Sequence, residues 1–248
     1  MTKRLTLWAL PLAVSMMLAG CSSNSASEPA QSAASTTSVD SQKEAASGGA
    51  LTAEQVKSVA SKLMEGDNAV QVVGNEQMQQ QLEIAKNAKA PSGIKPEKCA
   101  ELNAKYSVTD LTASVSATAT SSSESVGKVV QVFSLTDDAT RNNVSQALTL
   151  DDLEGCENVT VETGGEKIET ERQILPLDVK ADQSLTMSTQ MDAGGGQLLT
   201  SVVVQALRDG DFVLVTLQTG SQQAAELAAQ AVELTDRAFA EIDAVRKQ

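Results

Sequence analysis

Histidine is absent from the 248 residues of the chain. Serine hydrolases with a Ser-His-Asp triad, thiol enzymes with a Cys-His pair and metal sites built on imidazole all require that side chain. The sequence also lacks the GxSxG, P-loop and GxGxxG patterns that mark a nucleophile elbow or a phosphate-binding loop. We therefore expect a protein that is not an enzyme, with no catalytic residue, no metal site and no cofactor.

Positive charge is also scarce. The chain has 19 Lys and Arg against 32 Asp and Glu, which gives a formal net charge of −13, and it contains no run of basic residues. Binding to nucleic acid needs clustered basic side chains that neutralise phosphates, so nucleic acid is excluded as a partner. Direct adsorption to anionic lipid is disfavoured for the same reason. The acidity is typical of a protein kept soluble outside the cytoplasm.

Aromatic residues make up only 2% of the chain, with one Trp, one Tyr and three Phe. The tryptophan, Trp8, lies in an N-terminal segment that we expect to be removed. About 200 residues then remain, enough for one sizeable domain. Its core must be built mainly from Val, Leu, Ile, Met and Ala.

Residues 1–20 have the three parts of a secretory signal. Lys3 and Arg4 precede a largely apolar stretch, Leu5–Leu18, which ends in small residues. This stretch is shorter than the roughly 20 residues of a membrane span. The sequence Leu18-Ala19-Gly20-Cys21 resembles the lipobox of bacterial lipoproteins at every position. The alternative is an ordinary signal peptide with a chance cysteine.

The lipobox resemblance implies that the signal is cut before Cys21 and that the cysteine thiol is lipidated. Two or more acyl chains hold a soluble domain firmly at a membrane. We therefore expect a lipid anchor on the extracytoplasmic side of the cell membrane. Residues 21–50 form the lipidated cysteine and a Ser/Ala/Thr-rich linker without apolar periodicity, which is typical of a flexible tether. Residues 51–248 are predicted to be a single folded domain.

Helical and strand patterns alternate in the folded part. Thr52 and Gln55 form a capping box before a run of apolar residues at helical spacing. A long helix is expected from Ser221 to Arg246, and Asp209-Gly210 predicts a tight hairpin. Shorter helices are expected over residues 75–88 and 97–104 and after Asp137. Strand patterns occur at residues 111–120, 128–135, from 159, and at 168–175, 184–191, 198–207 and 212–218, and the short apolar segment Val70–Val73 also fits a strand. The interpretation is an α+β domain with an antiparallel sheet of about six or seven strands and helices packed on it.

The two remaining cysteines, Cys99 and Cys156, make an even pair in an oxidising compartment. A disulfide between them closes a loop of about 58 residues, which by chain entropy stabilises the fold by roughly 4 kcal/mol. The alternative is a redox-active pair, but the sequence has no CxxC motif and no histidine to lower a thiol pKa. We predict a structural disulfide.

Several other motifs are better explained by local structure than by chemistry. An SxxK match lacks the companion motifs of penicillin-binding enzymes. A triple glycine lacks the lysine of a phosphate loop and is interpreted as a turn. Acidic pairs are typical of helix starts and of the hairpin, and none has EF-hand spacing. These motifs are Ser92–Lys95, Gly194–Gly196, Asp137/Asp138, Asp151/Asp152 and Asp209/Asp211.

The overall layout resembles bacterial, and more narrowly actinobacterial, cell-envelope lipoproteins, and residues 51–245 are similar to the extracellular sensor domain of the mycobacterial serine/threonine kinase H type. The resemblance rests on the anchor and linker, the capped first helix, the positions of Cys99 and Cys156, and the sequence ALRDGDFVLVTL before a C-terminal helix. The chain lacks the cysteines for the second disulfide usual in that family. The resemblance implies a sheet cradled by helices with a ligand cleft.

Two kinds of partner follow from this interpretation, besides the membrane itself. The first hypothesis is a sensor-like domain that binds an unknown small molecule or envelope component, at residues that the sequence does not identify. The alternatives are a module that binds another envelope protein through an apolar patch, and a lipid carrier with a deep apolar cavity.

Overall fold

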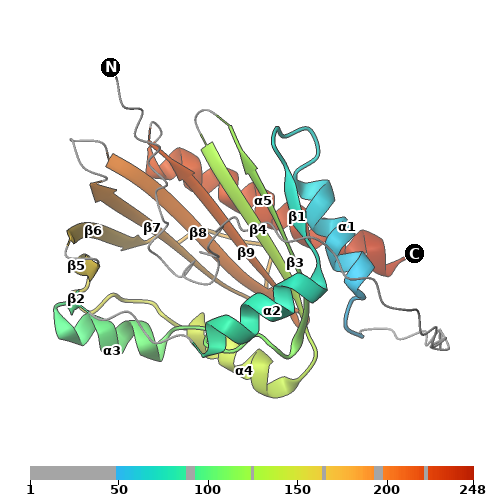
Figure 1. The fold of residues 1–248 in the computed structure, drawn as a ribbon, viewed down its shortest axis with the longest axis horizontal. Coiled ribbons are helices and arrows are strands. Elements are labelled where there is room, and N and C mark those ends of the chain that lie inside the picture. The colour runs from blue at the N-terminus through green and yellow to red at the C-terminus, as the bar shows by residue number, and fades with distance from the viewer. Residues whose placement is uncertain (1–48, 88–92, 124–125, 164–165, 193–197, 221–222) are drawn as a thin grey trace, which may run out of the picture.

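The computed structural model describes residues 49–87, 93–123, 126–163, 166–192, 198–220 and 223–248. It has the predicted α+β architecture, in which helices pack on a large antiparallel sheet (Figure 1). The elements are α1 (Ala53–Leu63), β1 (Gln71–Val73), α2 (Asn75–Lys86), β2 (Ile94–Lys95), α3 (Glu97–Lys105), β3 (Ser114–Ser122), β4 (Val126–Leu135), α4 (Asp138–Ala147), β5 (Asn158–Thr163), β6 (Glu166–Ile174), β7 (Gln183–Asp192), β8 (Leu198–Arg208), β9 (Asp211–Thr219) and α5 (Ala224–Arg246).

All nine strands belong to one sheet, in the order β1-β3-β4-β9-β8-β7-β6-β5-β2. The sheet has more strands than the predicted six or seven: the short apolar segment Val70–Val73 forms the edge strand β1, of three residues, and the edge strand β2, of two residues, was not predicted. Segments this short carry almost no periodicity, and they form because β3 and β5 offer free hydrogen-bonding edges. The predicted Asp209-Gly210 turn joins β8 to β9, and both residues have positive φ, as a type I′ turn requires.

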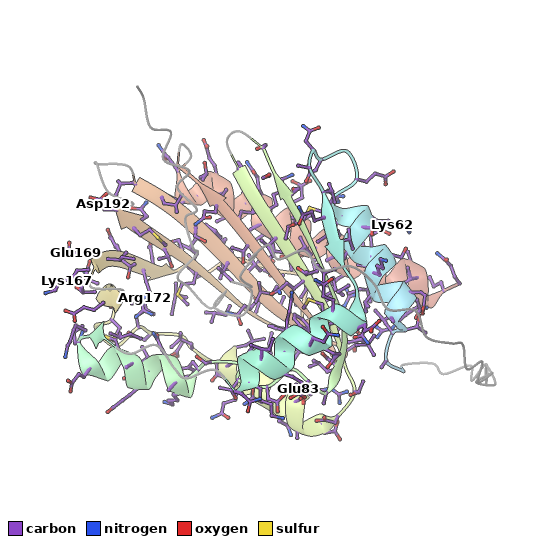
Figure 2. All side chains as sticks on the ribbon, viewed as in Figure 1. Lys62, Glu83, Lys167, Glu169, Arg172 and Asp192 are labelled. Carbon is purple, nitrogen blue, oxygen red and sulfur yellow. A yellow bond between two sulfur atoms is a disulfide. The ribbon has the colours of Figure 1, made fainter. Side chains whose placement is uncertain are left out.

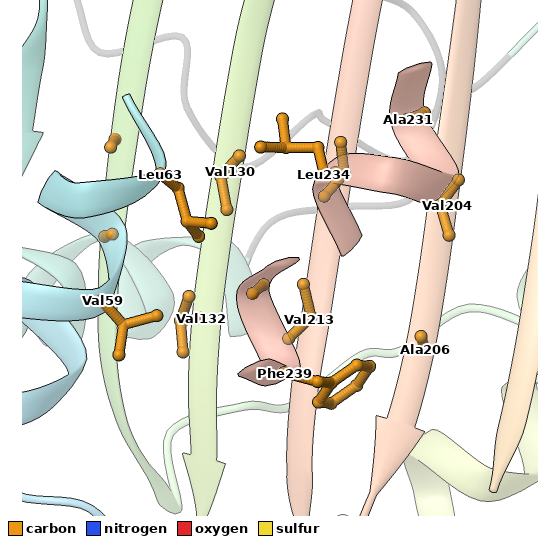
Figure 3. Close-up of a cluster of buried hydrophobic side chains, with 14 of the residues drawn as sticks. Val59, Leu63, Val130, Val132, Val204, Ala206, Val213, Ala231, Leu234 and Phe239 are labelled. Carbon is orange, nitrogen blue, oxygen red and sulfur yellow. The ribbon is translucent and has the colours of Figure 1, made fainter. Parts of the chain in front are cut away.

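One face of the sheet carries the larger hydrophobic core, against α1 and α5 (Figure 3). Val59 and Leu63 of α1 and Phe239 of α5 contribute to it. The strands contribute alternate residues, because successive side chains point to opposite faces. The labelled strand residues are Val130, Val132, Val204, Ala206 and Val213. We call this the α1/α5 face.

The opposite face is covered at one end by α2, α3 and α4. In Figure 1, α2 crosses in front of the lower end of the sheet, whereas α5 runs behind it. Phe133 and Phe212 belong to this second core, with ring centroids 5.7 Å apart. The predicted disulfide is confirmed: Cys99 of α3 is bonded to Cys156, with Cα atoms 5.6 Å apart, and both residues are buried within this core.

The helix starts agree with the sequence patterns where the structure describes them. Thr52 and Gln55 form the predicted capping box, and Asp137 caps α4. Ser221 lies outside the described residues, and α5 begins at Ala224. Within the described ranges, no helix combines the length and hydrophobicity needed to cross a membrane. The signal peptide, Cys21 and most of the linker lie outside the described residues, so their assignments stay predictions.

Candidate functional site

A line of polar residues crosses the opposite face of the sheet. Cross-strand pairing joins one residue from each of six adjacent strands, from β3 at one end to β6 at the other. Five have polar side chains and the sixth is glycine. In spatial order they are Ser122, Gly127, Gln218, Ser201, Thr189 and Arg172. We call this set the polar row.

Further polar side chains lie on the same face beside the row. Thr120 and Thr216 flank Val129 in the next line, and Gln131 and Gln205 flank Leu214 in the line after that. The lines beyond, under α2 and α4, are dominated by apolar side chains such as Phe133 and Phe212. The opposite face is therefore divided into an apolar end, covered by helices, and a polar end.

Two hydrogen-bonding atoms of β9 have no partner among the described residues. These are Thr216 Oγ1 and Gln218 Nε2, and neither atom is exposed to solvent. Thr216 is only 5% exposed as a residue. By contrast, Thr118 on the same face donates its hydroxyl to the carbonyl oxygen of Val130 at 3.1 Å. Buried polar groups are normally paired, so β9 carries hydrogen-bonding capacity that the described part of the chain leaves unused.

Arg172 ends the row at β6. Its Nε and Nη2 donate to the carbonyl oxygen of Cys156 at 3.1 and 2.8 Å, and Nη1 donates to Asn103 Oδ1 at 2.9 Å. Figure 2 shows Arg172 between β6 and α3. Burial lowers the pKa of its guanidinium, and the charge of Glu157 opposes this. The disulfide fixes the chain at Cys156, so it also positions the carbonyl that orients Arg172.

A second polar cluster lies on the α1/α5 face, where sequence reasoning placed only a turn. Asp211 is 1% exposed, and its Oδ2 accepts a hydrogen bond from Arg246 Nη1 at 2.6 Å. Its Oδ1 accepts from the Ser134 hydroxyl at 2.9 Å, and Ser134 in turn accepts from the backbone N–H of Leu51 at 2.9 Å. Burial raises the pKa of Asp211, against the opposing effect of Arg246 and Ser134. The cluster joins the start of the folded domain to the end of α5 and is structural.

Two of the other acidic residues singled out in the sequence accept local backbone hydrogen bonds. Asp137 Oδ1 accepts from the backbone N–H of Thr140 at 2.7 Å, and Asp152 Oδ1 accepts from that of Glu154 at 2.6 Å. No group of three potential metal ligands occurs within the part of the chain that the structure describes. Ser92 and residues 194–196 lie outside that part, as does Cys21.

Two surface grooves lie away from the polar row. One, of about 600 Å³, runs between α5 and residues 177–180 and is lined by Leu177, Lys180, Ala229 and Asp236 among others. The second, of about 690 Å³, lies between the starts of α1 and α2 and has a polar lining. Neither groove includes a residue of the polar row, and neither contains an unpartnered buried polar atom.

Comparison with known proteins finds similarity in solved structures alone. No protein-family model and no curated protein sequence matches the chain. The extracellular domain of PknH from Mycobacterium tuberculosis is 12% identical, with a TM-score of 0.45, covering 77% of this chain and 100% of that one. An uncharacterized protein from Mycobacterium smegmatis is 14% identical, with a TM-score of 0.43, covering 75% of this chain and 96% of that one.

Proposed function

We propose that this chain is a non-catalytic extracytoplasmic protein whose domain binds a ligand across the polar row. The observation that carries the proposal is the pair of buried, unpartnered groups on β9, Thr216 Oγ1 and Gln218 Nε2. They lie in or beside a line of polar residues that spans six strands. A ligand with oxygen atoms at this position supplies the missing partners.

The energetics of hydrogen bonding support this reading. A buried donor or acceptor without a partner destabilises a fold by about 1–3 kcal/mol. Two such groups on one strand are therefore a substantial cost for a domain whose net stability is about 5–15 kcal/mol. A binding site explains the cost, because the groups become paired when the ligand is present.

The proposed location rests on the N-terminal sequence. The signal-like residues 1–20 and the lipobox-like sequence before Cys21 indicate export and lipidation. The buried Cys99–Cys156 disulfide is consistent with an oxidising compartment. In this proposal the lipid holds the protein at the membrane, and residues 22–50 tether the domain.

The substitution Cys21→Ser tests the anchor. It removes the thiol that is acylated, so the protein is expected to move from the membrane fraction to the soluble exported fraction. Immunoblotting of the two fractions measures the change, and mass spectrometry of the wild-type N-terminal peptide detects the acyl chains. A Cys21→Ser protein that stays in the membrane fraction contradicts the lipid anchor.

A pair of matched threonine substitutions tests the binding site through stability. In ligand-free protein, Thr216→Val is expected to raise the free energy of unfolding by about 1 kcal/mol, because it removes an unpartnered buried hydroxyl. Thr118→Val is expected to lower it by a similar amount, because that hydroxyl is paired with Val130. Both residues are buried threonines on the same face, so urea unfolding of the two variants isolates the effect of pairing.

The same variants test binding directly. Native mass spectrometry of wild-type protein exposed to a cell-envelope extract is expected to show a bound small molecule. Thr216→Val combined with Gln218→Leu is expected to lose it, whereas Thr118→Val retains it. Wild-type protein that captures nothing, together with a Thr216→Val variant that is no more stable than wild type, contradicts the proposed function.

A further inference from the structure

The described chain enters the fold at one buried residue. Gly49 and Ala50 are exposed, whereas Leu51 is only 2% exposed and belongs to the core on the α1/α5 face. Its backbone N–H donates to the Ser134 hydroxyl at 2.9 Å, inside the protein. A pull on the chain that precedes the domain therefore acts first on Leu51.

The contacts of Leu51 lead to the middle of the sheet. Ser134 of β4 and Asp211 of β9 are cross-strand partners, and the Ser134 hydroxyl donates to Asp211 Oδ1 at 2.9 Å. The two strands are paired from Val126 and Thr219 at one end to Ser134 and Asp211 at the other. They are the third and fourth of the nine strands in spatial order, so each has a neighbouring strand on both sides. A load that reaches Ser134 is therefore shared among the central strands.

Two further contacts join the same point to the end of α5. Arg246 donates to both carboxylate oxygens of Asp211, at 2.6 and 3.1 Å. In the first turn of α1, the Gln55 amide donates to the carbonyl oxygen of Val245 at 3.1 Å. Hydrogen bonds between charged groups are stronger than those between neutral groups. The start of α1 is therefore held by side chains and backbone from β4, β9 and α5.

We propose that Leu51, Ser134, Asp211 and Arg246 form a clamp that transfers tension on the N-terminal tether to the central strands, so that α1 does not unwind first. The inference rests on the proposed anchor at Cys21: a domain that is held by one tether while it binds a fixed envelope component is pulled at Leu51. Helix ends open at little free-energy cost unless they are held. Unwinding of residues 51–70, up to the start of β1, lengthens the tether by up to about 70 Å.

Pulling on single molecules tests the clamp. The chain from Cys21 to Gln248, with Cys21 unacylated, carries one handle on that thiol and a second on Glu169→Cys. Glu169 is an exposed residue of β6, at the other end of the sheet from α1 (Figure 1, Figure 2). Cys99 and Cys156 are bonded to each other and buried, so they do not react with the handles. With the clamp intact, we expect no extension step of about 70 Å before the sheet unfolds.

Two matched variants each remove one buried side-chain hydroxyl. Ser134→Ala breaks the link from Leu51 to Asp211 and leaves the ion pair of Asp211 in place. It is expected to show the step of about 70 Å at forces below those that unfold the sheet. At constant force, α1 is expected to be released at least about tenfold faster than in the unsubstituted chain. Thr118→Val removes a buried hydrogen bond of β3 that has no link to Leu51, and it is expected to show no such step.

Three results overturn the inference: an early step of this length in the chain with the clamp intact, its absence in Ser134→Ala, or its presence in Thr118→Val. If Ser134→Ala does not fold, Gln55→Ala, which removes the contact with Val245, takes its place with the same expected step. The handle replaces the lipid, so the result does not depend on acylation in the cell. Fractionation of Cys21→Ser tests the anchor separately.

Discussion

Removal of the Cys99–Cys156 disulfide by the double substitution C99A/C156A is expected to lower the free energy of unfolding by about 4 kcal/mol. The two residues are 57 positions apart in sequence, and a cross-link over a loop of this length strongly restricts the unfolded chain. The expected loss is a large fraction of the 5–15 kcal/mol by which domains are usually stable. Urea unfolding at equilibrium measures it.

Loss of the disulfide is also expected to change the local structure around Arg172. It joins α3 to the segment before β5, and both sulfur-bearing residues are buried. Without it, the Cys156 carbonyl that accepts from Arg172 is less firmly placed. The Arg172 Nε–H signal is therefore expected to shift or broaden in C99A/C156A. Cys21→Ser, which removes a cysteine from the segment predicted to be the lipid anchor, is the control and is expected to leave stability unchanged. A loss below about 1 kcal/mol in C99A/C156A contradicts the chain-entropy argument.

The elements that sequence patterns identified are those with strong local signals. The capping box at Thr52, the Asp209-Gly210 turn and the pairing of Cys99 with Cys156 all depend on a few adjacent residues or on simple parity. The short apolar segment Val70–Val73 indicated β1, whereas β2 was not predicted because it forms only through its pairing with β5. The residues of such short edge strands form hydrogen bonds with the edge of a longer strand, and they have little sequence periodicity of their own.

The polar row was not predictable from the sequence, because it depends on the register of six strands at once. Ser122 and Arg172 are 50 positions apart but belong to one line across the sheet. In the sequence, Thr189 and Ser201 look like ordinary solvent-facing residues of alternating strands. A shift of one residue in any strand pairing moves its contribution to the other face. The site therefore appears only once the pairing of β4, β9, β8 and β7 is known.

Asp211 illustrates a different failure of local reasoning. In the sequence, an aspartate at this position beside a glycine is accounted for by the hairpin turn. In the structure, its carboxylate is buried against Arg246, which is 35 positions away. The pairing arises because the β8–β9 turn lies beside the last turn of α5. No short-range pattern marks such a contact.

Asp211→Ala is accordingly expected to lower the free energy of unfolding by about 3–5 kcal/mol. The substitution leaves the Arg246 guanidinium partly buried without its carboxylate, and it also leaves the Ser134 hydroxyl without its acceptor. The surface pair Asp138–Arg141 is the matched control. It has the same chemistry and a similar N–O distance of 2.7 Å, but the Asp138 side chain is 87% exposed. Asp138→Ala is expected to cost no more than about 1 kcal/mol.

A double substitution separates the interaction between Asp211 and Arg246 from the contribution of each residue alone. Replacing both partners by apolar residues of similar size, Asp211→Leu with Arg246→Met, removes the buried charges together and is expected to restore much of the stability lost in Asp211→Ala. Chemical denaturation of the single and double variants gives the interaction energy between the two sites. If Asp211→Ala costs no more than Asp138→Ala, burial does not strengthen this ion pair. The link from Leu51 through Ser134 and Asp211 to the end of α5 then contributes little to holding the fold together.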